Sequence, residues 1–195
     1  MTYRRQKKMQ SARGFSMIEV LVTMFILLVG LLGLVKLMLV SQHTEMESYQ
    51  RAQALILLHD MAGRINANRT VAGCYAISDA AAGTVYIGSG SSAFPNCSLG
   101  SVEAYTLANN DLLAWDNLLK GASETSGSAR LGAMIGARGC VSFDSGSRAY
   151  LLSVAWQGIG NSAAPASGLA CGRGLYGTET QRRIVSTTLQ IANLN

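Results

Sequence analysis

An apolar segment near the N-terminus constrains this chain more than any other feature. Residues 15–40 read FSMIEVLVTMFILLVGLLGLVKLMLV, and the only charged side chains among them are Glu19 and Lys36. Phe15 to Val35 is 21 residues, which as a helix rising about 1.5 Å per residue crosses the roughly 30 Å hydrocarbon core of a bilayer. We therefore expect a transmembrane helix over residues 15–36, with the Lys36 ammonium reaching the far headgroups.

The charges that precede this segment predict its orientation. The first 14 residues contain no acid and five basic side chains: Arg4, Arg5, Lys7, Lys8 and Arg13. Basic residues beside a span favour the cytoplasmic side, so the chain after Val40 is expected outside the cytoplasm. These five also account for the whole net charge of +5. The rest of the chain is neutral, which disfavours direct nucleic-acid binding.

Gly14 and Glu19 are the two residues that an ordinary signal anchor does not explain. Small-residue cleavage sites of secretory signals follow the apolar stretch, whereas Gly14 stands immediately before it. Cleavage there would leave the whole span on the mature protein. An ionised Glu19 inside lipid costs about 3 kcal/mol, which the new α-amino group of Phe15 on a neighbouring copy could offset.

The run R-G-F-S-M-I-E-V-L, residues 13–21, resembles the leader junction of type IV prepilins. The resemblance implies that residues 1–14 are a cytoplasmic leader, removed between Gly14 and Phe15 by a membrane prepilin peptidase. It also implies N-methylation of Phe15 and a role for Glu19 in docking into a growing filament. Major pilins commonly carry a proline partway along this helix, whereas this segment has only Gly30 and Gly33 as weak helix formers.

The helix is expected to continue beyond the membrane to about Asn68, since no proline occurs before Pro95. Two acid-to-base pairs at i,i+4 spacing, Glu47 with Arg51 and Asp60 with Arg64, support residues 37–69 as a periplasmic continuation. One face carries an apolar stripe that needs a surface to cover: Ala54, Leu58, Met61 and Ile65.

Residues 58–69, L-H-D-M-A-G-R-I-N-A-N-R, further resemble minor pilins of the PilV type and, more loosely, the corresponding pseudopilins of type II secretion. The PilV resemblance extends more weakly through the Trp115 region, Gly-Cys-Val at 139–141 and Val-Ala-Trp at 154–156.

Residues 70–195 are expected to form a globular periplasmic domain. Residues 70–101 are rich in glycine, serine and alanine and predict loops with a short strand at 84–87. A second helix is predicted between Ser101 as cap and Gly121 as stop, with Trp115 on its buried face.

Three further segments predict strands: 140–143, 149–157 and 183–192. In the second and third, apolar or β-branched residues alternate onto one face, which indicates a sheet with one face covered. We expect an α+β, pilin-like fold in which a small antiparallel sheet packs on the outer half of the long helix.

The four cysteines lie far apart in the sequence and form no CxxC pair, which disfavours a metal site. In an exported chain they predict two disulfides among Cys74, Cys97, Cys140 and Cys171. Three pairings are possible. The sequential one is favoured, because it closes two local loops.

Catalytic, nucleotide-binding and metal motifs are missing from the sequence, so neither an enzyme nor a cofactor is expected. His43 and His59 lie about 24 Å apart along one helix and cannot share a metal. Both tryptophans, Trp115 and Trp156, are expected in the core rather than as base-stacking residues.

Four functions remain open. The favoured one is a minor pilin that helps to initiate type IV pilus assembly near the tip and supports twitching and adhesion. Its expected partners are other minor and major pilins, the prepilin peptidase, the inner-membrane assembly platform and a tip adhesin. Its expected location is the inner membrane and pilus of a Gram-negative bacterium. The alternatives are a minor pseudopilin, a DNA-uptake pilin and an enzyme on an uncut anchor.

Overall fold

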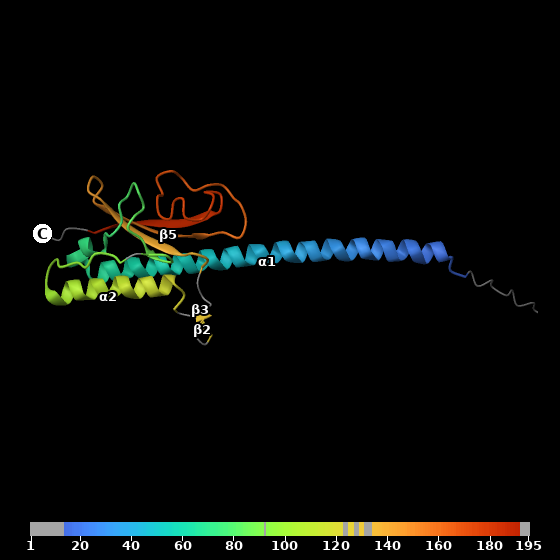
Figure 1. The fold of residues 1–195 in the computed structure, drawn as a ribbon, viewed down its shortest axis with the longest axis horizontal. Helices are drawn as coiled ribbons and strands as arrows, with labels where there is room; N and C mark the ends of the chain where they lie inside the picture. The colour runs from blue at the N-terminus through green and yellow to red at the C-terminus, as the bar shows by residue number, and fades with distance from the viewer. Residues whose placement is uncertain (1–13, 92, 123–124, 127–128, 131–133, 192–195) are drawn as a thin grey trace, which may run out of the picture. The chain divides into compact units, whose positions relative to one another are not determined.

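A computed structural model describes residues 14–191 apart from 92, 123–124, 127–128 and 131–133. The expected leader, residues 1–14, lies outside the described residues except for Gly14. The chain divides into two compact units, Met1–Thr44 and Glu45–Asn195. The helix α1 (Met17–Ala67) contributes residues to both, and it confirms the long N-terminal helix that the sequence predicts (Figure 1).

The second unit combines a helical layer with a four-stranded antiparallel sheet. After α1 come a 3-10 helix η1 (Arg69–Tyr75) and α2 (Val102–Leu119). The sheet contains β1 (Ile87–Gly88), β4 (Arg138–Asp144), β5 (Ala149–Gln157) and β6 (Arg182–Gln190), in the order β1-β4-β5-β6. A separate hairpin pairs β2 (Thr125–Ser126) with β3 (Ala129–Arg130). This arrangement confirms the α+β, pilin-like fold class.

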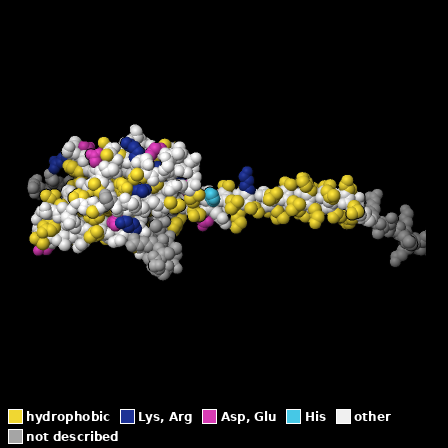
Figure 2. Space-filling view, in the orientation of Figure 1, with side chains coloured by type: hydrophobic (Ala, Val, Ile, Leu, Met, Phe, Trp, Pro, Cys, Tyr) yellow, Lys and Arg dark blue, Asp and Glu magenta, His cyan; other side chains and the backbone are white. Residues whose placement is uncertain are grey.

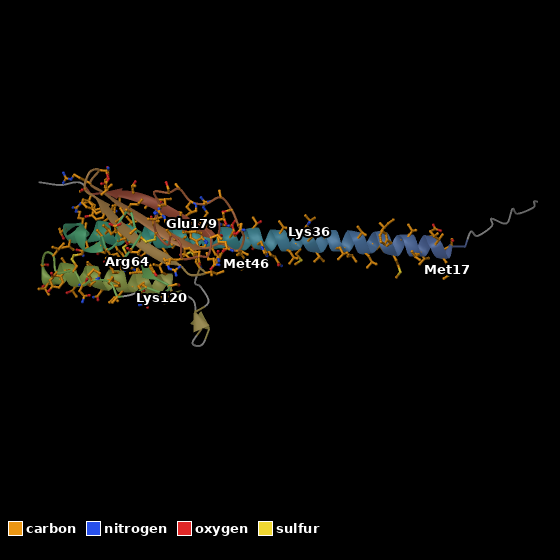
Figure 3. All side chains as sticks on the ribbon, turned by 45° about the horizontal axis from the view of Figure 1, so that its top comes forward. Met17, Lys36, Met46, Arg64, Lys120 and Glu179 are labelled. Carbon is orange, nitrogen blue, oxygen red and sulfur yellow. A yellow bond between two sulfur atoms is a disulfide. The ribbon has the colours of Figure 1, made fainter. Side chains whose placement is uncertain are left out.

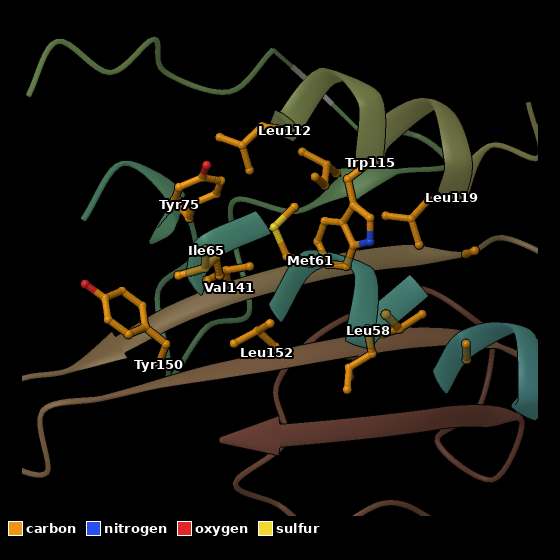
Figure 4. Close-up of a cluster of buried hydrophobic side chains, with 14 of the residues drawn as sticks. Leu58, Met61, Ile65, Tyr75, Leu112, Trp115, Leu119, Val141, Tyr150 and Leu152 are labelled. Atoms are coloured by element: carbon orange, nitrogen blue, oxygen red, sulfur yellow. The ribbon is translucent and has the colours of Figure 1, made fainter. Parts of the chain in front are cut away.

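The core lies between α1, α2 and the inner face of the sheet. The predicted stripe of α1 is buried throughout, with Ala54, Met61 and Ile65 at 0% exposure. From the sheet, Val141 and Leu152 (Figure 4) complete the same cluster, together with Val154. An amphipathic helix over an alternating sheet removes the apolar faces of both from water, at roughly 25 cal/mol per Å² of apolar surface.

Trp115 is the largest fully buried side chain of this core. Its indole N–H donates to the Leu57 carbonyl oxygen at 2.9 Å, which links α2 to α1. A Cβ at Gly139 would lie only 2.5 Å from the indole ring. Glycine at this position therefore lets β4 approach Trp115, which explains the first residue of the Gly-Cys-Val segment.

A buried polar network joins the end of α1 to α2. Asp111 accepts from the Arg64 guanidinium at 2.8 Å and from the Tyr75 hydroxyl at 2.6 Å. Asn68 donates its amide N–H to the Ala104 carbonyl oxygen at 2.8 Å. Burial and the hydrogen bond to Asp111 both raise the pKa of Tyr75. Arg64 and Asn68 belong to the segment that resembles minor pilins, and here they hold the domain together.

Two disulfides tie the loops to this core, as the four cysteines of an exported chain predicted. Cys74 bonds to Cys97, and Cys140 bonds to Cys171. This is the sequential pairing, and each bond adds about 3 kcal/mol on the chain-entropy account for loops of this length.

The expectation that the sheet has one covered face is wrong along β5. Besides the inward residues, Ser153 and Ala155 on the opposite face are buried. A second cluster covers them and contains Cys140, Ala155, Cys171 and Tyr176. The Cys140–Cys171 bond holds the segment 158–181 over this face, a long-range constraint that strand alternation cannot reveal.

Other sequence expectations needed smaller corrections. The strand predicted at 84–87 is β1, and it contains only Ile87 and Gly88. Glu47 does not pair with Arg51. It accepts from the Arg183 guanidinium at 3.0 Å instead. Arg183 belongs to β6, which is far from Glu47 in sequence, so local spacing could not predict this pair. Asp60 and Arg64 do pair, at 2.8 Å.

Arg182 is a buried cation that the sequence analysis did not single out. Its side chain is 1% exposed and donates to the carbonyl oxygens of Leu169 and Cys171 at 2.8 and 3.0 Å. The Glu179 carboxylate neutralises it at 2.6 Å. This pair fixes the loop 158–181 against the start of β6.

The Glu179 carboxylate should make the stability of the domain depend on pH. The Gly174 backbone N–H and the Arg182 guanidinium lower the pKa of Glu179, and they outweigh its partial burial. A lowered folded-state pKa contributes stability above the unfolded value of 4.5, and this contribution is lost as pH falls through the folded pKa. Because the Glu179 side chain is 38% exposed and solvent screens the pair, we expect Glu179→Gln to cost only about 1 kcal/mol at pH 7 and to weaken the loss of stability below pH 4.5.

Denaturant unfolding of the full chain in detergent between pH 7 and 3 measures this effect. The control is Glu45→Gln, which alters an exposed acid of α1. Identical pH profiles for the wild type and Glu179→Gln would show that the pair contributes nothing.

Candidate processing and membrane site

The apolar part of α1 presents its side chains outward along its length. Every residue from Met17 to Val40 is exposed, and hydrophobic side chains cover this segment (Figure 2). Among the described residues, α1 is the one helix long and apolar enough to cross a membrane. Met17 and Lys36 lie near the two ends of the apolar segment (Figure 3). A surface of this kind needs lipid or other apolar helices around it.

The predicted cleavage junction lies just before the first turn of this helix. Gly14, Phe15 and Ser16 precede the helical residues. The Ser16 carbonyl oxygen accepts from the backbone N–H groups of Glu19 and Val20, at 3.0 and 3.3 Å. Phe15 is 82% exposed, and no heavy atom of the described residues beyond its chain neighbours lies within 4 Å of a Cβ built on Gly14. Nothing in the described chain shields the Gly14–Phe15 bond.

Glu19 lies in the first turn of α1, one turn from the junction. The positive end of the helix dipole favours an anion there, typically by less than 1 kcal/mol. This is smaller than the cost of about 3 kcal/mol for a carboxylate in lipid. Lys36 is 17 residues further on, about 25 Å along the helix. Within the described part of the chain, no cation forms an ion pair with Glu19.

Two glycines share the helical face of Glu19, a feature that the sequence analysis did not use. At 100° per residue, Gly30 lies about 20° and Gly33 about 40° from the direction of Glu19. Apart from the adjoining helix backbone, no described atom lies within 4 Å of a Cβ built on either glycine. Small residues on one face let two membrane helices approach closely. The signal was present in the spacing, since Gly30 and Gly33 follow Glu19 by 11 and 14 residues.

The four cysteines lie in the second unit and belong to its core rather than to the junction. The described residues contain no group of three or more His, Cys, Asp or Glu side chains that could hold a metal ion. His43 and His59 are both exposed on α1. The predicted site residues therefore fall into two sets: Gly14, Phe15 and Glu19 at the start of the helix, and the structural cysteines elsewhere.

Residues 9–35 match a family model described as the prokaryotic N-terminal methylation motif. The match covers residues 9–14 of the predicted leader, the junction and most of the apolar segment. Together with the fold, it supports a type IV pilin-like family and a chain that is a pilin or pseudopilin in general. Comparisons with curated proteins and with solved structures gave no match.

Proposed function

We propose that this chain is a minor type IV pilin of the PilV type. In this role it takes part in initiating and assembling the pilus near its tip, and it supports twitching motility and adhesion. The methylation motif and the pilin-like fold support a structural protein that associates with other pilins and is processed by a prepilin peptidase. Its further partners are the inner-membrane assembly platform and a tip adhesin.

The proposed maturation removes residues 1–14 and methylates the new amino group of Phe15. The exposed junction supports this step, because a membrane peptidase must reach the bond between Gly14 and Phe15. Cleavage before the apolar segment keeps the anchor on the mature chain. The five leader cations support a cytoplasmic leader. The disulfide-bonded domain would then lie in an oxidising compartment, which in the proposed Gram-negative cell is the periplasm.

The observation that carries the proposal is the Glu19 carboxylate in the first turn of an exposed apolar helix, where no cation of the described residues pairs with it. After cleavage, the α-amino group of Phe15 is a cation one helical turn from Glu19. The amine of one subunit can then neutralise Glu19 of its neighbour, so that assembly removes the cost of an unpaired carboxylate in lipid. Gly30 and Gly33 on the same face allow the two helices to approach.

Deleting the gene distinguishes this function from that of a minor pseudopilin of type II secretion. We expect the deletion to abolish surface pili and twitching while secretion of folded exoproteins continues. Restoration of both pilus functions by the wild-type gene in trans completes the test. Loss of secretion with pili intact would assign the chain to the secretion system instead.

Complementation with Glu19→Ala tests the docking role. We expect the variant to be cleaved and inserted into the membrane normally. Its amount in sheared pili should fall about 100-fold, because losing roughly 3 kcal/mol of pairing free energy lowers the assembly equilibrium constant by about two powers of ten. Quantitative immunoblotting of pili and membranes measures the ratio. Glu45→Ala, on the same helix beyond the apolar segment, is the control and should assemble normally. Equal assembly of both variants would show that Glu19 does not take part in docking.

A further inference from the structure

The outer edge of β6 carries backbone groups that no other part of the described chain satisfies. β6 is the last strand of the order β1-β4-β5-β6. It pairs with β5 over nine consecutive residues without a bulge, from Arg182 opposite Gln157 to Gln190 opposite Ala149. At the other edge, β1 pairs with the start of β4, and Ser78 hydrogen-bonds with Val141.

The register of β6 with β5 determines which residues of β6 direct their backbone N–H and C=O groups toward this edge. The Gly158 N–H donates to the Gln181 carbonyl oxygen at 2.8 Å, one step beyond the Gln157–Arg182 pair. Opposed residues of an antiparallel ladder alternate between hydrogen-bonded and non-hydrogen-bonded pairs. Counting from this bond, Val185, Thr187 and Leu189 bond to β5. The residues between them direct their N–H and C=O groups away from it.

A second contact confirms this phase independently. The backbone N–H of Arg182 donates to the Glu179 carbonyl oxygen at 3.3 Å. This N–H therefore points away from β5, as the alternation requires. The same parity applies to Ser186, Thr188 and Gln190, which together present six backbone hydrogen-bonding groups. No hydrogen bond within the described residues uses any of them. All three residues are exposed.

Within the part of the chain that the structure describes, this edge lacks the features that usually prevent strand pairing. Natural edge strands are protected by lysine, proline, a bulge or a covering segment. Residues 184–190 read IVSTTLQ, with no charge and no proline. The two arginines before them are already engaged, Arg182 with Glu179 and Arg183 with Glu47. Seven residues at about 3.3 Å each provide a free edge of roughly 23 Å.

We propose that this free edge binds an extended segment of another pilin-like subunit, which adds a fifth strand to the sheet. The chemistry of the edge specifies the segment, because backbone donors and acceptors at strand spacing are matched by another strand. On the inner face, Thr187 and Leu189 are half-buried at the margin of the core. The incoming strand should place apolar residues beside them and uncharged polar residues beside Ser186 and Thr188. The proposal rests on the proposed function, since it needs an assembled partner.

Proline at position 188 tests the edge with little effect on the sheet itself. The Thr188 N–H points outward, so Thr188→Pro removes a docking donor and no bond to β5, and proline is tolerated on edge strands. We expect the variant to fold with both disulfides, while its amount in sheared pili falls about tenfold, which corresponds to about 1.4 kcal/mol. Thr188→Ala keeps the N–H and should assemble within about twofold of wild type. Wild-type assembly of a folded Thr188→Pro chain would overturn the proposal.

Amide hydrogen exchange on the wild-type full chain decides the question even if Thr188→Pro fails to fold. In detergent, the amides of Ser186, Thr188 and Gln190 should exchange quickly, while those of Val185, Thr187 and Leu189 are protected. In pili, the first set should become protected as well. Rapid exchange of that set in assembled wild-type chain would reject strand docking and leave the proposed function intact. Absence of the wild-type chain from pili would reject the proposed function, and strand docking with it.

Discussion

Replacing Gly14 with valine is expected to leave the chain unprocessed, 14 residues longer than the mature form and retained in the inner membrane. A Cβ at Gly14 meets no atom of the described residues beyond its chain neighbours within 4 Å, so this part of the chain accommodates the larger side chain. Loss of processing would therefore mean that the active site of the peptidase, which must accept the residue before the scissile bond, does not accept valine. We expect the mature form to fall at least 100-fold, as judged by immunoblotting of membranes and pili.

A matched substitution controls for the effect of valine itself. Gly63→Val places the same side chain on the exposed face of α1, again with no atom within 4 Å of the new Cβ. This variant should be processed like wild type, because valine favours helix more than glycine does. If the Gly14→Val chain reached pili in its shorter form at normal abundance, cleavage after Gly14 would be wrong.

The largest effect on stability is expected for Trp115→Ala. The indole ring is 0% exposed between α1, α2 and β4, and truncating a buried tryptophan typically costs about 3–5 kcal/mol. The variant also leaves the Leu57 carbonyl oxygen without its donor. For a domain of this size we expect the melting temperature to fall by roughly 10 °C, measured by near-UV circular dichroism of the full chain in detergent.

Trp115→Phe separates packing from the hydrogen bond. Phenylalanine retains an aromatic ring in the core but cannot donate to Leu57, so a smaller loss, of about 1–2 kcal/mol, is expected. Both variants keep Gly14, Phe15 and Glu19, and processing should continue in each. A melting temperature for Trp115→Ala within about 2 °C of wild type would show that the core does not depend on this residue.

Local periodicity predicted the main elements well. The α1 stripe from Ala54 to Ile65 is the face that packs on the domain, and Ser101 caps α2 by accepting from the Ala104 N–H at 3.3 Å. The strand predicted at 149–157 has the same bounds as β5. These features depend on residues close in sequence, where side-chain spacing and capping determine the backbone conformation.

Features that depend on distant partners could not be predicted in the same way. Glu47 has a basic residue one turn away, yet it pairs with Arg183, 136 residues further along the chain. The buried Arg182 and the covered outer face of β5 both depend on the loop that the Cys140–Cys171 bond holds. The sequence indicated two disulfides but not the surface that they would cover.

The candidate site was more accessible to sequence reasoning than the domain was. Gly14, Phe15 and Glu19 are neighbours in sequence, so their placement around the first helical turn required no tertiary information. The free edge of β6 is different, because it depends on strand order and on the phase of a ladder. The alternating residues 185–191 predicted a strand, but not that its outer side would lack a partner among the described residues.

In the proposed maturation, cleavage after Gly14 creates the amine that pairs with Glu19 of a neighbouring subunit. The intact mass of the chain recovered from pili shows whether this cleavage and the methylation of Phe15 take place. We predict a mass that corresponds to residues 15–195 with two disulfides and one methyl group on the Phe15 nitrogen. A mass that includes Met1 and the rest of the leader in assembled chain would contradict it.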